Sequence, residues 1–259
     1  MKPARALLAL FFSACAGSPA EPSAAPAGTS SVADSCAVAR PDFGGVATEA
    51  ARTLFAYDAN APLNLQKTVE STSNGVEVSA VSFSSPGGGS VTGLLFDPVK
   101  DLQRAVDVLR ARANVDDERI AYVGVSYGGA MGALFVGIER RIKAAVLVVG
   151  DGGLVSHFTG PEDSSFMASL SCATRVDWFR AMAPIEPIRF IAHASPTALL
   201  LQNGRLDNLV PEADAEELHA AAPQPRTIRW YAAGHGLNQQ ALWDRHDWLQ
   251  EQVGLDARQ

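Results

Sequence analysis

Residues 120–130 read Ile-Ala-Tyr-Val-Gly-Val-Ser-Tyr-Gly-Gly-Ala. An apolar segment typical of a buried strand leads into Gly124-Val-Ser-Tyr-Gly128, and a stretch rich in small residues follows. A G-x-S-x-G motif between a strand and a helix is a nucleophile elbow. We expect this turn to hold Ser126 in a strained backbone conformation. We expect glycine at 124 and 128 because a Cβ at either place would collide with the neighbouring strand or helix.

The elbow predicts two reactive groups. The hydroxyl of Ser126 would stand at the carboxyl end of the strand. The N–H of Tyr127, in the first turn of the helix, would be free to bind an oxyanion. The alternative is an ordinary glycine-rich turn between a strand and a helix. The apolar strand before the motif and the helical stretch 130–138 after it favour the elbow.

Size and charge narrow the class of protein. The chain has 259 residues, of which 47% are hydrophobic and 19% charged, and this predicts one globular domain with a sizeable core. The net charge of −7 and the lack of a basic run argue against a nucleic-acid partner. No apolar stretch approaches the roughly 20 residues that span a bilayer.

The first 14 residues have the pattern of a signal peptide. Lys2 and Arg5 precede an apolar run over 6–12, and Phe12-Ser-Ala-Cys15 is similar to the bacterial lipobox, although Phe12 replaces the usual Leu. We expect export across the bacterial inner membrane, to the periplasm or to a membrane surface through a lipid on Cys15. The alternative is a soluble exported protein that has lost Cys15. Residues 15–45 are rich in Ala, Pro and Ser and predict a flexible tether.

The remaining residues, 46–256, alternate between strand and helix patterns. Such alternation predicts a mostly parallel sheet flanked by helices. Strands 76–83 and 91–96 are expected to form an N-terminal antiparallel hairpin. The irregular segment 154–189 could form a cap. The other expected strands cover 120–125, 143–149, 196–202 and 227–231, and the expected helices cover 48–55, 101–112, 130–138, 212–221 and 238–253.

Three polar residues each follow a predicted strand: Ser126, Asp207 and His235. Ligand sites of open α/β sheets lie at the carboxyl ends of the strands. The order Ser, Asp, His is that of the α/β-hydrolases. His235 would take the proton of the serine, and Asp207 would orient the imidazole. Asp151 is the rival acid, but the Gly-x-x-Asp-x-x-Val-Pro spacing around Asp207 predicts a loop that leads into a helix.

Other candidate residues have weaker patterns. Of the remaining histidines we keep only His157, as a cap contact, and no cluster has the spacing of metal ligands, so no metal is expected. Cys36 and Cys172 could form a disulfide in an oxidising compartment, or they could be two unrelated small residues.

The chain resembles the α/β-hydrolase superfamily, in particular its bacterial dienelactone-hydrolase-like and acetyl-xylan-esterase-like branch. The matching segments cover roughly residues 50 to 255. Dienelactone hydrolases proper use a cysteine nucleophile, so the serine indicates the esterase side of the group. The resemblance implies no cofactor and a small-molecule or acylated-sugar ester as substrate, and the sequence does not indicate an oligomeric state. The segments are Gly93–Pro98, Asp116–Ile120, Gly124–Gly129, Gly204–Asp207 and Gly234–Gly236.

One departure from the family lies between Pro98 and Asp101. Family members carry there a strand, a His-Gly loop, a helix and a second strand, roughly 40 residues at usual element lengths. Only Val99 and Lys100 fill the gap here. We hypothesise an internal deletion that removes two inner strands, the helix between them and the second oxyanion donor. Loss of one such donor costs about 100- to 1000-fold in rate.

Three functions remain open at this point. The first is a serine esterase that works through an acyl-enzyme. The second is a prolyl-oligopeptidase-like peptidase, which the Ser-Tyr-Gly-Gly sequence also resembles but which usually carries a propeller domain before the hydrolase part. The third is a non-catalytic relic hydrolase that serves as a surface lipoprotein.

Overall fold

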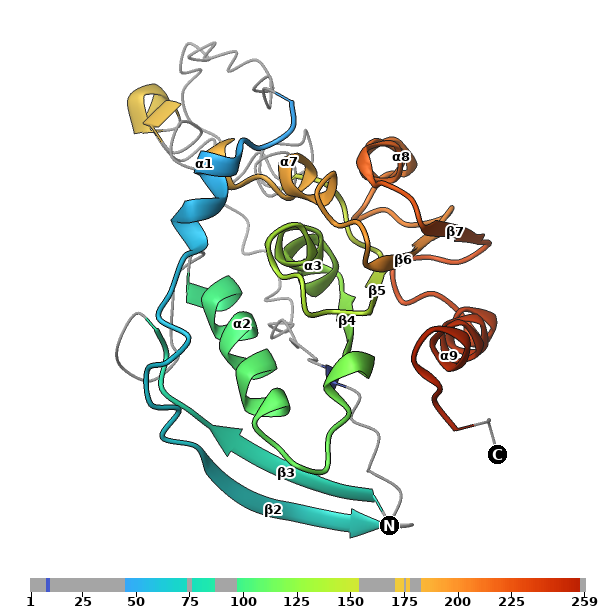
Figure 1. Ribbon diagram of the computed structural model, residues 1–259. Coiled ribbons are helices and arrows are strands. Elements are labelled where there is room, and N and C mark those ends of the chain that lie inside the picture. The colour runs from blue at the N-terminus through green and yellow to red at the C-terminus, as the bar shows by residue number, and fades with distance from the viewer. Residues whose placement is uncertain are drawn as a thin grey trace, which may run out of the picture.

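The strand that precedes Ser126 lies inside a parallel sheet in the computed structural model of the protein (Figure 1). The sheet has the order β1-β4-β5-β6-β7, and each neighbouring pair is parallel. Its strands are β1 (Leu8–Ala9), β4 (Ala121–Val125), β5 (Ala144–Val148), β6 (Ala198–Gly204) and β7 (Arg226–Tyr231). The structure describes residues 8–9, 45–73, 76–86, 97–153, 171–174, 176–177 and 183–256.

Alternate residues of the strands face two separate hydrophobic clusters, as the period of two in a β-strand requires. Tyr122 and Leu147 belong to one cluster, together with residues of the helices on that face. Val123 and Val146 belong to the other, with Leu249 of the opposite helix. The predicted α/β class, a mostly parallel sheet covered by helices, is therefore confirmed.

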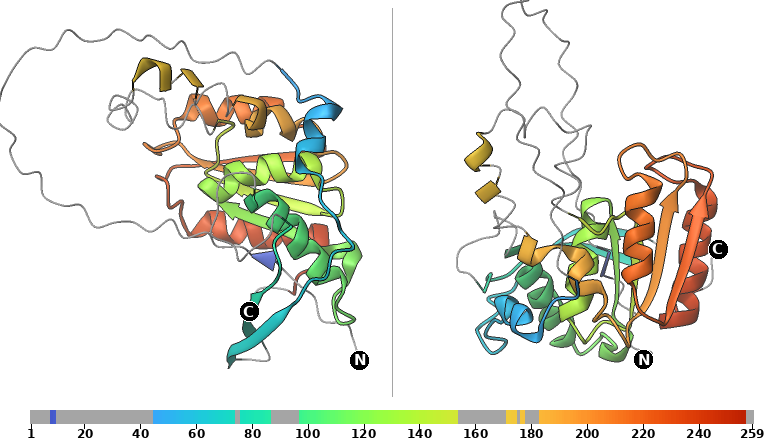
Figure 2. Two further views of the ribbon diagram at one scale, coloured as in Figure 1. Left: turned by 90° about the vertical axis from the view of Figure 1, so that its left-hand side faces the viewer. Right: turned by 90° about the horizontal axis from the view of Figure 1, so that it is seen from above.

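The helices lie on both faces of this sheet. α9 covers one face and α8 the other, as the right-hand view of Figure 2 shows. α3 begins directly after Ser126 and packs against α7, and α7 in turn contacts α8. The helices are α2 (Asp97–Arg110), α3 (Tyr127–Ile138), α7 (Pro187–Ile191), α8 (Glu212–Ala221) and α9 (Gln239–Val253), with short 3-10 turns at Asp117–Arg119 and Ala183–Ile185.

The N-terminal part of the domain starts with α1 (Glu49–Arg52) and a 3-10 turn, Thr53–Phe55, where a helix is expected. The hairpin differs from the prediction. β3 (Val76–Ser82) pairs with β2 (Gln66–Ser73), which precedes it in the chain, and the expected partner 91–96 lies outside the described residues. β2 is polar, so its hydrophobic pattern is weak. Asn74-Gly75 between the strands, a favoured hairpin pair, is the signal that could have found it.

The edge of β4 is covered by an unexpected partner. Leu8 and Ala9 pair in parallel with Tyr122 and Val123. The hairpin does not cover this edge, because it forms a separate two-stranded sheet. Val99 and Lys100, the junction of the hypothetical deletion, lie inside α2, which is continuous across them. The deletion itself stays a hypothesis.

A buried ion cluster fastens residues 57–61 to α2. Arg104 is 1% exposed, and its guanidinium donates to the carbonyls of Ala59 and Ala61 and to the Asp107 carboxylate. The Tyr57 hydroxyl contacts the same carboxylate, and Arg141, after α3, contacts Tyr57 and Asp107. The cluster therefore joins the N-terminal segment, α2 and the chain before β5.

Several predicted features fall outside the described residues. They are the signal peptide, Cys15 with its lipid, most of the tether, Cys36, His157 and much of the segment 154–189. Cys172 is disulfide-bonded, and the partner predicted for it is Cys36. Among the helices that the structure describes, none is long and apolar enough to cross a membrane.

Close packing of α3 on α7 makes Gly137 a test of the fold. A Cβ at this position would lie 2.2 Å from the carbonyl oxygen of Phe190, a backbone atom that cannot rotate away. We expect Gly137→Ala to lower the free energy of unfolding by about 1–3 kcal/mol, because overpacking outweighs the gain in helix propensity. Urea unfolding measures the change. Gly236→Ala, where a Cβ would meet nothing within 4 Å, is the control, and equal stability of the two variants would contradict the prediction.

Stability should also depend on pH through His219 in α8. Its side chain is buried, its Nε2 lies 2.9 Å from Oδ1 of Asn203, and burial, aided by Arg226, lowers its pKa from 6.5 to about 4. Between these values the unfolded chain binds more protons, so stability is full above pH 6.5 and is lost as the pH falls towards 4. We expect a loss of about 3 kcal/mol by the lower limit.

The variant His219→Gln keeps a donor for Asn203 but cannot titrate. Urea unfolding at a series of pH values should therefore give a flatter profile for this variant between pH 6.5 and 4. Identical profiles for variant and parent would show that another group controls acid stability.

Candidate active site

The nucleophile elbow forms at the carboxyl end of β4. Ser126 has φ 57° and ψ −120°, a conformation that a non-glycine residue adopts only under strain. Its N–H donates to the carbonyl of Val148 on the neighbouring strand at 2.8 Å. α3 begins at Tyr127, so the N–H of Tyr127 belongs to the first turn, whose donors have no partner within the helix.

The two glycines of the motif serve different purposes. A Cβ on Gly124 would lie 2.1 Å from the carbonyl oxygen of Gly128, so only glycine fits where β4 and α3 meet. A Cβ on Gly128 would lie 3.8 Å from the Tyr122 hydroxyl, an ordinary contact. The expected collision is therefore correct for Gly124 and wrong for Gly128, because a Cβ on the buried Gly128 would make only an ordinary van der Waals contact.

Asp207 lies in the loop that follows β6. Its Oδ1 accepts hydrogen bonds from the N–H groups of Leu209 and Val210 at 2.9 and 3.1 Å. Its Oδ2 lies 2.8 Å from Nδ1 of His235, and the carboxylate side chain is fully buried. The loop therefore holds the carboxylate in one orientation, with one oxygen left for the imidazole.

His235 completes the arrangement from the loop between β7 and α9. Its Nε2 lies 2.8 Å from Oγ of Ser126, and its side chain is 24% exposed. A carboxylate can only accept, so a neutral His235 carries its proton on Nδ1 and presents the lone pair of Nε2 to the serine. The three residues, 81 and 28 positions apart in sequence order, form one hydrogen-bonded chain, Ser126–His235–Asp207.

The rival candidates have other contacts. Asp151, after β5, is buried, and its Oδ1 accepts from the N–H of Gly153. His193 contacts the carbonyl of Ala47, and His246 lies near Asp247. Within the part of the chain that the structure describes, no group of three or more His, Cys, Asp or Glu side chains could hold a metal ion.

Sequence reasoning missed how the end of β5 supports the elbow. Val149 has φ 44°, a strained value for a β-branched residue, and Gly150 follows it. A Cβ on Gly150 would lie 2.7 Å from the backbone of Gly129 in the first turn of α3, and a Cβ on Gly129 would lie 2.8 Å from the carbonyl of Val148. The signal in the sequence is a glycine placed directly after a fully apolar strand.

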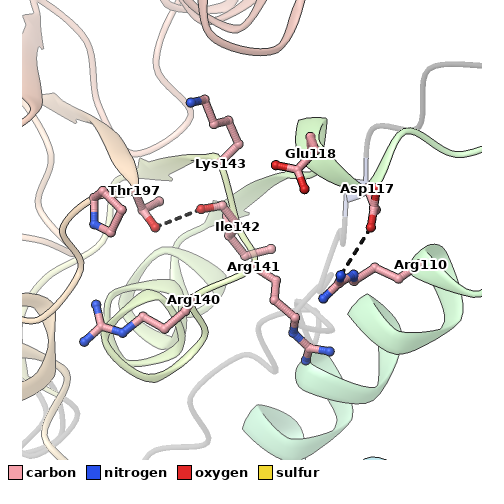
Figure 3. Close-up of a pocket in the computed structure, with 9 residues that line it drawn as sticks. Arg110, Asp117, Glu118, Arg140, Arg141, Ile142, Lys143 and Thr197 are labelled. Atoms are coloured by element: carbon pink, nitrogen blue, oxygen red, sulfur yellow. Dashed lines mark hydrogen bonds and ion pairs between the residues drawn. The ribbon is translucent and has the colours of Figure 1, made fainter.

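A cavity of about 280 Å³ lies near the amino-terminal ends of the strands, away from the ends that carry Ser126, Asp207 and His235 (Figure 3). The residues that line it come before β4, β5 and β6 in the sequence. Ser126, Asp207 and His235 come after β4, β6 and β7. Figure 3 shows Arg140, Arg141 and Lys143 leaving one short segment in different directions. Arg110 is paired with Asp117, and Arg141 with Glu139. The cavity is therefore separate from the candidate active site.

The fold and the elbow define the class of the protein as a serine hydrolase of the α/β-hydrolase superfamily. Residues 97–244 match the family model of the prolyl oligopeptidase family. The chain therefore belongs to the prolyl oligopeptidase family. From the sequence, a peptidase of this kind is the second choice, because such peptidases usually carry a propeller domain before the hydrolase part. The match covers the hydrolase part alone, so the lack of a propeller in these residues does not separate the two branches.

Known proteins with similar sequence or structure include both esterases and peptidases. The chain is 28% identical over 175 residues to the protein YfhR of Escherichia coli K12, covering 65% of this chain and 54% of that protein. The chain thus spans about half the length of this relative. The acetyl xylan esterase from Paenibacillus sp. R4 superposes with a TM-score of 0.61 at 13% identity, over 79% of this chain and 92% of that one. A puromycin-hydrolyzing peptidase of Mycobacterium tuberculosis superposes with a TM-score of 0.52 at 20% identity, over 63% of this chain and 27% of that one.

Proposed function

We propose that the protein hydrolyses carboxylic esters through an acyl-enzyme formed on Ser126. The observation that carries this proposal is the hydrogen-bonded chain in which both imidazole nitrogens of His235 have a partner, Ser126 on one side and Asp207 on the other. A serine hydroxyl is a weak nucleophile until a base takes its proton, and an imidazole oriented by a carboxylate is suited to do so.

The reaction follows from these contacts. Nε2 of His235 takes the proton of Ser126 as Oγ bonds to the ester carbonyl carbon. The oxyanion that forms receives a hydrogen bond from the N–H of Tyr127. The C–O bond to the alcohol then breaks, and His235 returns the proton to the leaving oxygen. Water attacks the acyl-enzyme in the same way, with His235 again acting as the base, and releases the acid and free Ser126.

Ester hydrolysis is the first choice over peptide hydrolysis for a chemical reason. An ester carbonyl is more reactive than an amide, and its alcohol leaves more easily than an amine. Among the residues that the structure describes, Tyr127 is the one oxyanion donor that we assign, and a site with one donor suits an ester better. Peptide hydrolysis is the second candidate, and the match to the prolyl oligopeptidase family over residues 97–244 favours it. The third reading, a relic without activity, is an outcome of the test below.

Substitution of the nucleophile tests the proposal directly. We expect the protein to react with a fluorophosphonate probe and to hydrolyse p-nitrophenyl acetate. We expect Ser126→Ala to abolish labelling and to reduce turnover at least about 1000-fold. Ser84→Ala, which removes a hydroxyl in the N-terminal segment that accepts from Asn64, should retain full activity.

A second substrate class decides between the two activities. Aminoacyl and dipeptidyl p-nitroanilides, assayed beside the ester, report peptidase activity. Turnover of the anilides that exceeds ester turnover would replace the esterase proposal by the peptidase one. Equal, negligible signals from the parent and Ser126→Ala would identify a relic.

The choice of acid can be tested by a matched pair. In Asp207→Asn, the amide can keep its bonds to Leu209 and Val210 but presents N–H to Nδ1 of His235, which favours the wrong tautomer. We expect kcat to fall about 10⁴-fold. Asp151→Asn should keep kcat within about tenfold, because Asp207, not Asp151, contacts the imidazole in the hydrogen-bonded chain. A larger effect of Asp151→Asn on steady-state hydrolysis would reverse the assignment.

A further inference from the structure

Tyr122 lies beneath the elbow and contacts it with a single hydrogen bond. The residue belongs to β4, its side chain is 0% exposed, and its hydroxyl donates to the carbonyl oxygen of Gly128 at 2.6 Å. The bond joins the strand before Ser126 to the first turn of the helix after it. Burial raises the pKa of Tyr122, so its hydroxyl keeps the proton that it donates.

Two glycines make room for this tyrosine. A Cβ on Gly124 would lie 2.6 Å from the Tyr122 hydroxyl, and a Cβ on Gly132 would lie 2.4 Å from its ring. The ring also packs against Phe135 at a centroid distance of 5.3 Å. One glycine of the motif and one glycine of α3 are thus placed where any larger residue would displace the tyrosine.

The peptide group between Ser126 and Tyr127, which carries the oxyanion donor, lies between two hydrogen bonds to neighbouring strands. Upstream, the N–H of Ser126 is held by the carbonyl of Val148 on β5. Downstream, the carbonyl of Gly128 is held by Tyr122 on β4. Between these two hydrogen bonds, Ser126 has a positive φ, and Gly128 belongs to the residue type with the largest conformational freedom. A donor that stabilises charge in a transition state must be oriented before the charge develops.

We propose that Tyr122 is a positioning residue for the hydrolysis proposed above, which orients the N–H of Tyr127 towards the oxyanion by holding the carbonyl of Gly128. The hydroxyl does not touch the substrate. It acts through the first turn of α3, so it influences the rates of acylation and deacylation, both of which pass through an oxyanion, and not the binding of the ester. The inference rests on the proposed function, since an oxyanion forms only if Ser126 attacks the ester carbonyl.

The test is Tyr122→Phe, which removes the hydroxyl and keeps the ring. We expect kcat for p-nitrophenyl acetate to fall about 10-fold, because a less well oriented N–H of Tyr127 stabilises the oxyanion less, with KM unchanged within about twofold. The matched control is Tyr57→Phe. It removes a hydroxyl that contacts Asp107 and Arg141, so its structural cost is at least comparable, yet it lies in the ion cluster away from the elbow. The control should keep the parent's kcat.

Hydrogen–deuterium exchange supplies a readout that does not require activity. In Tyr122→Phe, the amides of residues 127–129 should exchange faster than in the parent, whereas Tyr57→Phe should leave them unchanged. An unchanged kcat together with unchanged exchange would overturn the proposal, and so would an equal loss of kcat in both variants. If the parent neither labels nor turns over, the proposed function fails, and the exchange result alone decides whether Tyr122 holds the turn.

Discussion

The structure depends on the close approach of β4 and α3 across the turn at Ser126. The position of a Cβ on Gly124 falls 2.1 Å from the carbonyl of Gly128, so strand and helix can meet only through glycine. This approach forces Ser126 to a φ of 57° and lifts its side chain clear of the sheet. The strain is sustained because both sides of the turn are held, by Val148 upstream and Tyr122 downstream. The reactive hydroxyl is therefore a product of backbone packing.

From this turn, the parallel order of the sheet places the other groups. β4, β6 and β7 run in the same direction, so the loops after them meet at one edge, and Asp207 and His235 need only short loops to approach Ser126. The 280 Å³ cavity lies near the amino-terminal ends of the strands, and Arg141 joins it to the ion cluster around Arg104. The candidate active site therefore lies at the carboxyl ends of the strands, and the cluster of charged side chains lies at their amino-terminal ends.

The sequence predicted the sheet well because β4, β5 and most of β6 are apolar runs, and because α2 has a regular hydrophobic periodicity. It also predicted the three residues of the hydrogen-bonded chain, since each follows a strand. It did not predict β2, because this polar strand has little hydrophobic pattern. It also did not predict the pairing of β1 with β4, because the two strands lie more than 100 positions apart in the sequence. The role of Tyr122 was hidden for another reason. A tyrosine in an apolar strand has the pattern of a core residue, and only the position of its hydroxyl distinguishes it.

The pairing of Leu8 and Ala9 with β4 places two demands on the same residues. An export signal must be accessible when the translocation machinery receives it, whereas an edge strand must be paired with its neighbour in a finished sheet. If residues 1–14 direct export, folding before translocation would hide the signal, and cleavage after it would leave the backbone of Tyr122 and Val123 without these partners. The released edge could then pair with a strand of another molecule. The timing of folding relative to processing would thus decide whether the mature protein remains alone or associates.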